Sequence, residues 1–210
     1  MKLIVMDMQK ALMDDELYNL QGLTANAVKL IQTARENEIE VIYIQHDAGA
    51  GTGFSMGDEG FEIADEVAPR EGEKVFIKTV SSSFGNGDFA SYLEATVDNT
   101  LMIIGLQTNF CVDATVKSAF ERGYHVIIPE GTNSTFDNPY MTGEITCAYY
   151  FNEVWPDLFA ECVSMDEAME MHYPQLSEIN SLRLAYGEPP PSKREAISGS
   201  LFEGAVSEAD

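Results

Sequence analysis

The stretch Ile103–Gly131, IIGLQTNFCVDATVKSAFERGYHVIIPEG, has the residue pattern of a strand, a turn, a helix and a second strand. The apolar runs Leu101–Ile104 and Val126–Ile128 predict the two strands. Between them, Val112–Phe120 has helical spacing and is followed by Gly123, a residue type that favours the left-handed conformation just past a helix. Apolar strands joined through a helix indicate a parallel sheet that is covered on both faces.

The rest of the chain repeats this alternation. Short apolar runs predict further strands at Leu3–Met6, Val41–Ile44, Val75–Ile77 and Glu161–Val163. Periodic segments predict helices at Thr24–Asn37, Phe89–Leu93 with Asp88 as its N-cap, Met141–Phe151 and Met165–Met171. The pattern therefore predicts an α/β fold with right-handed crossovers, in which ligands bind beyond the carboxyl ends of the strands.

The composition excludes several classes of partner. The 210 residues include 35 acidic and 12 basic side chains, for a net charge of -23. Such a surface repels nucleic acid and anionic membranes, and its acid excess serves either solubility or the selection of ligands by charge. The opening MKLIVMDMQK lacks the apolar length of a signal peptide, and three widely spaced cysteines fit reduced thiols. We therefore expect a cytoplasmic protein with no membrane span.

The chain is predicted to form one domain over residues 1–186 and a C-terminal tail over residues 187–210. Pro189-Pro190-Pro191 and the glycines near it break any long element. The tail is either mobile or packed on a neighbouring subunit. The aromatic segment Phe136–Trp155 supplies either core and subunit contacts or substrate contacts. Together these segments favour a homo-oligomer, a dimer or a tetramer.

Three reactive side chains follow the ends of predicted strands. Asp7 follows the first strand, Lys78 the third and Cys111 the fourth, where it opens a helix. The helix N-terminus and the lysine would favour the thiolate, which is the nucleophilic form of cysteine. Asp7 would act as general base and acid, and Lys78 would hold the two anionic groups together. Backbone N–H groups between Gly105 and Cys111 would bind a developing oxyanion.

Each of these residues also has a structural explanation when it is taken alone. Asp7 is of a type that caps helices or stabilises turns. Lys78 is of a type that is usually solvated, and Cys111 is of a type that is often a small buried apolar side chain. The convergence of three strand ends is what favours a catalytic role.

Three motifs resemble those of the isochorismatase-like cysteine hydrolase superfamily, over residues 1 to about 171. These motifs are VMDMQ with Asp7, VFIKTVSSSFGNGDF with Lys78, and the stretch Ile103–Gly131 quoted above with Cys111. The resemblance implies a three-layer α/β/α sandwich around a mostly parallel six-stranded sheet. It also implies Asp7 as proton acceptor, Lys78 as its partner and Cys111 as nucleophile. A cis Leu106–Gln107 peptide and an oxyanion hole from the N–H groups of Gln107 and Cys111 are implied as well.

Departures from the family patterns narrow the expected reaction. Members that hydrolyse the vinyl ether of isochorismate lack the nucleophilic cysteine. The presence of Cys111 in this chain therefore favours C–N amide hydrolysis through a thioester. Nicotinamidase-type members bind a metal with an aspartate and two histidines after the second strand, whereas only His46 and Asp47 stand there. We therefore predict no catalytic metal and no cofactor. Asn109 replaces a frequent aspartate, with no predicted consequence.

The substrate is expected to be a small molecule. The residues predicted to line its pocket are Gln9, His46, Phe54, Phe84 and Phe110. His46 would serve as a pocket wall or hydrogen-bond donor. The alternatives are a nicotinamidase-like or ring-opening hydrolase, a thiol-dependent transferase, and a binding or scaffold protein with a vestigial site.

Overall fold

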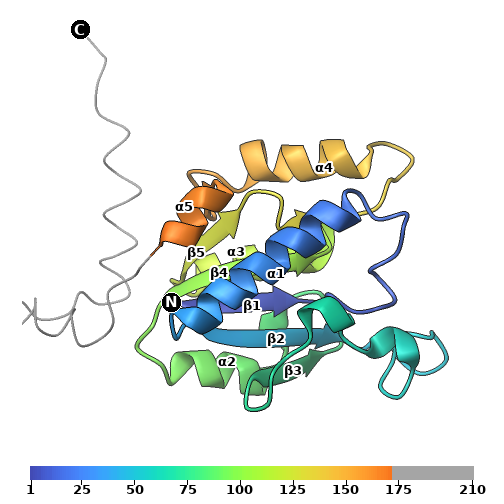
Figure 1. Cartoon of the computed structure of the whole chain (residues 1–210), viewed down its shortest axis with the longest axis horizontal. Coiled ribbons are helices and arrows are strands. Elements are labelled where there is room, and N and C mark those ends of the chain that lie inside the picture. Colours follow the sequence, from blue (N-terminus) through green and yellow to red (C-terminus); the bar gives the residue numbers. More distant parts are fainter. Residues whose placement is uncertain (172–210) are drawn as a thin grey trace, which may run out of the picture. The chain divides into compact units, whose positions relative to one another are not determined.

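A computed structural model of the chain describes residues 1–171. One parallel sheet has the strand order β3-β2-β1-β4-β5-β7, in which each predicted strand is present (Figure 1). Its strands are β1 (Lys2–Met6), β2 (Glu40–His46), β3 (Lys74–Lys78), β4 (Thr100–Leu106), β5 (His125–Pro129) and β7 (Glu161–Val163). A two-residue strand, β6 (Asn133–Ser134), pairs with the end of β4 and makes the sheet seven-stranded rather than six-stranded. The predicted α/β class is confirmed, while the boundary at residues 186 and 187 lies outside the described residues.

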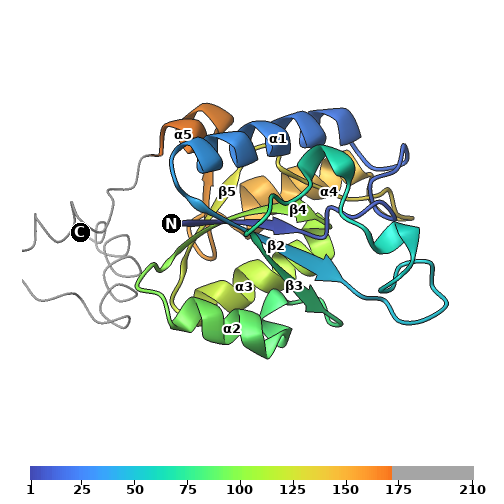
Figure 2. The same ribbon diagram turned by 60° about the horizontal axis from the view of Figure 1, so that its bottom comes forward.

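Helices cover both faces of the sheet because its strands are apolar on both sides. The helices are α1 (Leu20–Glu36), α2 (Gly87–Glu94), α3 (Asp113–Glu121), α4 (Gly143–Tyr149) and α5 (Met165–Glu170). In β1, Leu3 and Val5 pack with the side chains of α1, while Ile4 and Met6 pack with those of α2 and α3. The helices accordingly lie in two layers, with α1 and α5 on one face and α2 and α3 on the other (Figure 2). None of the helices within residues 1–171 is long and apolar enough to cross a membrane.

The ends of two helices depend on local hydrogen bonds. The N-cap of α2 is Asn86, whose side chain accepts a hydrogen bond of 2.8 Å from the N–H of Phe89. The prediction of Asp88 at this position was wrong, because the helix begins two residues earlier than its apolar residues suggest. Gly123 has φ 79° just past α3, as its residue type predicts.

A glycine sets the approach of β4 to β1. Gly105 has φ 124°, and a Cβ at this position would lie 2.0 Å from the backbone oxygen of Met6. Only glycine therefore lets the two strands run side by side to their carboxyl ends. The consequence is functional, because Asp7 follows β1 and the turn that contains Cys111 follows β4.

Candidate active site

Three strand ends bring the predicted catalytic side chains together. Asp7 directly follows β1, and Lys78 is the last residue of β3. Cys111 lies in a π-helical turn, Thr108–Val112, that joins β4 to α3. Because β2 stands between β3 and β1, the long lysine side chain has to cross the end of β2 to reach Asp7. The thiol thus sits in the π-helical turn that runs directly into α3.

The ammonium group of Lys78 is the centre of this cluster. Its Nζ donates to Oδ2 of Asp7 at 2.7 Å and to Sγ of Cys111 at 3.2 Å. A third contact joins Nζ to Nδ1 of His46 at 3.3 Å. The lysine and the aspartate are both buried, and a buried charge requires such partners. A lysine ammonium has three N–H groups, so these contacts use its full donor capacity.

The Cys111 thiol is protonated at neutral pH in this arrangement. Burial raises its pKa to about 11, the negative charge of Asp7 acts in the same direction, and Lys78 opposes both. The structure therefore differs from the expectation of a resting thiolate, since burial outweighs the lysine. An attack by this sulfur requires a base that removes the proton as the new bond forms.

Asp7 has the properties of that base. Burial raises the pKa of Asp7, and the Lys78 ammonium and the Cys111 thiol oppose the rise. Its Oδ1 has no hydrogen-bond partner among the described residues, although the atom is buried. The backbone of Asp7 is left-handed, with φ 50°, and its N–H donates to the carbonyl of Ile44 at 2.9 Å. The carboxylate thus keeps one oxygen for proton transfer while the lysine holds the other.

The side chain of Gln9 holds the backbone of His46 in place through hydrogen bonds. The Oε1 of Gln9 accepts a 2.7 Å hydrogen bond from the N–H of His46, and its Nε2 donates to the carbonyl oxygens of His46 and Phe61. Gln9 is fully buried and links the end of β2 to the 3-10 turn Glu59–Phe61, and its place in the substrate pocket stays a prediction. Its partners lie 37 and 52 residues away in the chain, which explains why sequence reasoning missed this role.

His46 faces the cluster as a neutral imidazole. Burial and the Lys78 ammonium lower the pKa of His46. Its Nδ1 faces the ammonium and accepts, so the ring proton resides on Nε2. The neighbouring Asp47 accepts hydrogen bonds on its Oδ1 from the hydroxyl of Ser55 and the N–H of Gly49. Within residues 1–171, no three His, Cys, Asp or Glu side chains are grouped to hold a metal ion.

The three phenylalanines predicted to line the pocket have different environments. Phe54 is half-buried with its ring 5.7 Å from that of His46, and Phe110 beside the thiol is 57% exposed. Phe84 lies instead in the core, with its ring 5.3 Å from that of Phe89. A short 3-10 turn, capped by the side chain of Ser82, directs Phe84 inward. Phe84 is thus a core side chain, and its place beside the substrate stays a prediction.

A buried threonine supports the turn that carries the thiol. The hydroxyl of Thr135 donates to Oδ1 of Asn109 at 2.7 Å and lies 3.2 Å from Oε1 of Gln107. The Leu106–Gln107 peptide is cis. Thr135 follows β6, and no motif in the sequence indicates that β6 pairs beside β4. This support was missed because it depends on that pairing.

The fold and the site together define a class of protein. Its members are α/β/α sandwiches with a cysteine, a lysine and an aspartate at the strand ends. The family model named Isochorismatase domain matches residues 2–154, and the chain belongs to this family of hydrolases. The isochorismatase family protein YddQ of Bacillus subtilis is 33% identical over 121 residues, which are 57% of this chain and 67% of YddQ.

Some similar proteins are named as amidases. The ureidoacrylate amidohydrolase RutB of Agrobacterium fabrum is 26% identical over 165 residues, covering 60% of this chain and 72% of RutB. The crystal structure of N-carbamoylsarcosine amidase from Thermoplasma acidophilum has a TM-score of 0.61 and 25% identity. That match covers 79% of this chain and 98% of the amidase. Hydrolases of this family thus include enzymes that act on amides.

Proposed function

We propose that the protein is a cysteine hydrolase that cleaves the C–N bond of a small amide through a thioester. The observation that carries the proposal is the single ammonium group of Lys78, which contacts Asp7 Oδ2, Cys111 Sγ and His46 Nδ1. The names of the amidase relatives support the choice of an amide bond.

In the first step, Sγ of Cys111 attacks the amide carbon while Asp7 accepts the thiol proton. The Lys78 ammonium stabilises the negative charge that develops on sulfur, so the raised pKa of the thiol is overcome only as the S–C bond forms. Asp7 then returns its proton to the amide nitrogen as the C–N bond breaks. The amine leaves and the acyl group remains on Cys111 as a thioester.

In the second step, water attacks the thioester carbon and Asp7 accepts one of its protons. The C–S bond breaks, the carboxylic acid leaves, and the thiol regains its proton from Asp7. Backbone N–H groups of the turn that ends at Cys111, with Gln107 among them, would bind the oxygen that becomes negative in both steps. No metal or cofactor takes part in this proposal.

The test is hydrolysis of a library of small amides by the wild-type protein and by Cys111→Ala. We expect the variant to lose about a thousandfold or more in kcat/KM, because the nucleophile is gone. Cys162→Ala is the matched control, since Cys162 is a half-buried thiol in β7 and is expected to keep full activity. Amide hydrolysis that survives Cys111→Ala unchanged would exclude the mechanism.

Mass spectrometry of the protein during turnover tests the intermediate. A mass increase on the peptide that contains Cys111 should equal the acyl part of the substrate, and it would therefore identify the substrate class. An unmodified Cys111 during active turnover, with rapid quenching, would favour direct attack by water. A protein that turns over none of the amides, with a thiol of ordinary reactivity, would favour the binding or scaffold alternative.

A further inference from the structure

A cavity lies outside the catalytic cluster, at the carboxyl end of β5 and β6. Its volume is about 330 Å³, which falls within the range of small-molecule sites. The walls come from the start of α1, the loop after β5, β6, α4 and the π-helical turn Tyr150–Val154 that follows α4. Asp7, Lys78 and Cys111 are not among the residues that line it. The cavity is therefore separate from the proposed catalytic site.

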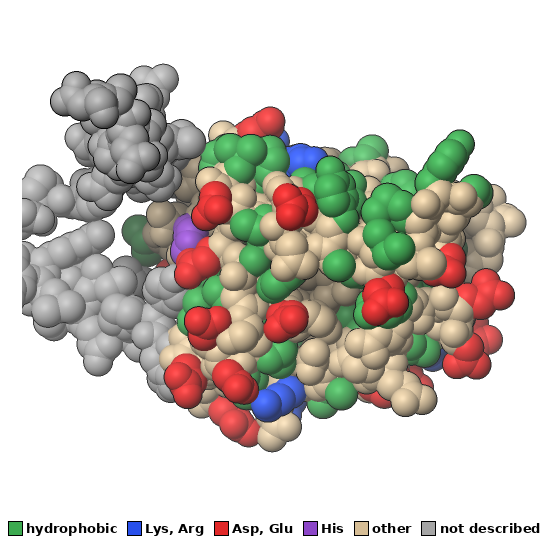
Figure 3. All heavy atoms as spheres, turned by 90° about the horizontal axis from the view of Figure 1, so that it is seen from above, with side chains coloured by type: hydrophobic (Ala, Val, Ile, Leu, Met, Phe, Trp, Pro, Cys, Tyr) green, Lys and Arg blue, Asp and Glu red, His purple; other side chains and the backbone are tan. Residues whose placement is uncertain are grey.

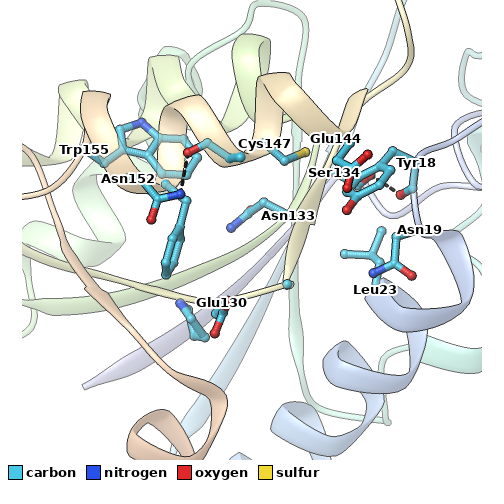
Figure 4. A pocket seen from close by; sticks show the side chains of 14 residues that line it. Tyr18, Asn19, Leu23, Glu130, Asn133, Ser134, Glu144, Cys147, Asn152 and Trp155 are labelled. Atoms are coloured by element: carbon cyan, nitrogen blue, oxygen red, sulfur yellow. Dashed lines mark hydrogen bonds between the residues drawn. The ribbon is translucent and has the colours of Figure 1, made fainter. Parts of the chain in front are cut away.

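The two charged side chains that line this cavity are both acidic. Glu130 and Glu144 line it, no lysine, arginine or histidine does, and neither carboxylate has an ion-pair partner within residues 1–171 (Figure 4). The face of the molecule on which α4 lies carries many more acidic than basic side chains (Figure 3). Burial and the charge of Glu144 both raise the pKa of Tyr18, which lines the same cavity. An anionic ligand would be repelled here, and a cation would be attracted.

Aromatic and apolar side chains form another part of the wall. Tyr18, Phe151 and Trp155 all line the cavity, and Leu23 and Ala148 add aliphatic surface. Trp155 is only 1% exposed and its Nε1–H donates to Asp113 at 3.1 Å, so its indole lies in the core behind the wall and offers a ligand no free donor. Aromatic rings next to carboxylates suit an organic cation, which gains from both, better than a hydrated metal ion.

One polar group in the wall lacks a donor. Asn133 lies in the middle of the cavity view, between α4 and Glu130 (Figure 4). Its Oδ1 accepts no hydrogen bond from the described residues, and its Nδ2 makes only a long contact of 3.4 Å with Thr132. A rotation of the amide group would present the oxygen to the cavity. A ligand with N–H donors supplies what this oxygen lacks.

We propose that this cavity is a binding site for a small organic ammonium compound, such as a primary alkylamine in its charged form. The ammonium group lies between Glu130 and Glu144 and donates to Asn133, while the alkyl chain packs against Phe151 and Ala148. The proposal does not depend on amide hydrolysis, because it uses none of the catalytic side chains.

The chain offers a direct probe of occupancy, because Trp155 is its only tryptophan. We would titrate the full-length protein with n-butylammonium chloride at low ionic strength and follow the tryptophan emission. A saturable change is expected with n-butylammonium and none with 1-butanol, with butyrate or with sodium chloride at matched concentrations. An identical response to 1-butanol, or no saturable response to n-butylammonium, would overturn the proposal.

Charge-neutral variants test the assignment of the site. Glu144→Gln and Glu130→Gln should each weaken n-butylammonium binding by about threefold to tenfold, as expected for partly exposed carboxylates. The matched control is Glu153→Gln. Glu153 is an exposed glutamate in the π-helical turn Tyr150–Val154 and does not line the cavity. An equal loss in the control would mean that only the general surface charge attracts the amine, and would contradict the site.

A third variant fills the cavity and leaves its charges in place. Ala148 is exposed on α4 and lines the cavity, so Ala148→Phe should be tolerated by the fold, which circular dichroism checks. This variant should lose the saturable emission change. If the variant is folded and still binds n-butylammonium with wild-type affinity, the ligand lies elsewhere. Since the readout is binding, these results stand whether or not the protein hydrolyses amides.

Discussion

A buried lysine is paired with a carboxylate at each end of the sheet, and the two pairs differ in what surrounds them. At the amino end, Lys2 of β1 donates to Oε2 of Glu40 at 2.6 Å, and the hydroxyl of Tyr92 donates to Oε1. At the carboxyl end, Lys78 holds one oxygen of Asp7, while the other has no hydrogen-bond partner within residues 1–171.

The pKa shifts of the two carboxylates have opposite directions. Burial alone would raise the pKa of Glu40, but the hydrogen bonds from Lys2 and Tyr92 outweigh it and lower the pKa. Burial raises the pKa of Asp7 despite the lysine. A carboxylate with a donor on each oxygen stays ionised and stabilises the fold, whereas one with a free, buried oxygen is suited to proton transfer. A lysine–carboxylate pair therefore stabilises the fold at one end, whereas the pair at the other end has the properties that the proposed mechanism requires.

The largest expected effect comes from removing the proposed base. Asp7→Asn should lower kcat/KM for the amide by about a thousandfold, since general-base catalysis is lost. Glu40→Gln at the other end should leave kcat/KM within about twofold, because Glu40 lies far from the thiol. Steady-state kinetics on both variants makes the comparison. Equal losses would mean that both pairs act only through stability.

The next effect concerns the free energy of unfolding. Lys78→Met leaves the buried Asp7 without its partner, and we expect a loss of about 3–5 kcal/mol. Lys2→Met should lose about 1 kcal/mol, because Glu40 keeps Tyr92 and is partly solvated. Urea unfolding followed by circular dichroism measures both variants. A larger loss for Lys2→Met would reverse the interpretation of the two ends.

The pH dependence of alkylation tests the link between Asp7 and the thiol. The rate of Cys111 alkylation should rise with a half-point near pH 11, since the thiol pKa is about 11. Asp7→Asn should move the half-point downward by about one unit, because the negative charge that favours the protonated thiol is removed. Peptide mass mapping separates Cys111 from Cys147 and Cys162. An alkylation half-point that is the same in Asp7→Asn and in the wild-type protein would favour a vestigial site.

The smallest effect is acid destabilisation at the amino end. The pKa of Glu40 is lowered in the folded state, so its stabilising contribution is present above its unfolded pKa and is lost as the pH falls through the folded pKa. Glu40→Gln should therefore reduce the stability difference between pH 7 and pH 3 by about 0.5–1 kcal/mol, after allowance for solvent screening. Urea unfolding at the two pH values measures this difference, with the exposed Glu71→Gln as control.

Sequence reasoning was most successful where a residue's role follows from its neighbours in the chain. The run Glu161–Val163 forms β7 with the predicted bounds, and Gly123 ends α3 in the predicted conformation. Such features depend on apolar periodicity and on local backbone preference. The start of α2 was misplaced by two residues, because the helix is capped by Asn86 and not by the predicted Asp88.

The sequence by itself determined the α/β class, the apolar strands and the candidate residues Asp7, Lys78 and Cys111, because strand ends of a parallel sheet share one edge. Only the tertiary structure decided how these groups behave. Burial, which no local pattern reports, raises the pKa values of Asp7 and Cys111. The hydrogen bonds of Gln9 and the cavity beside α4 also require contacts between distant segments, and such contacts exist only once the chain has folded.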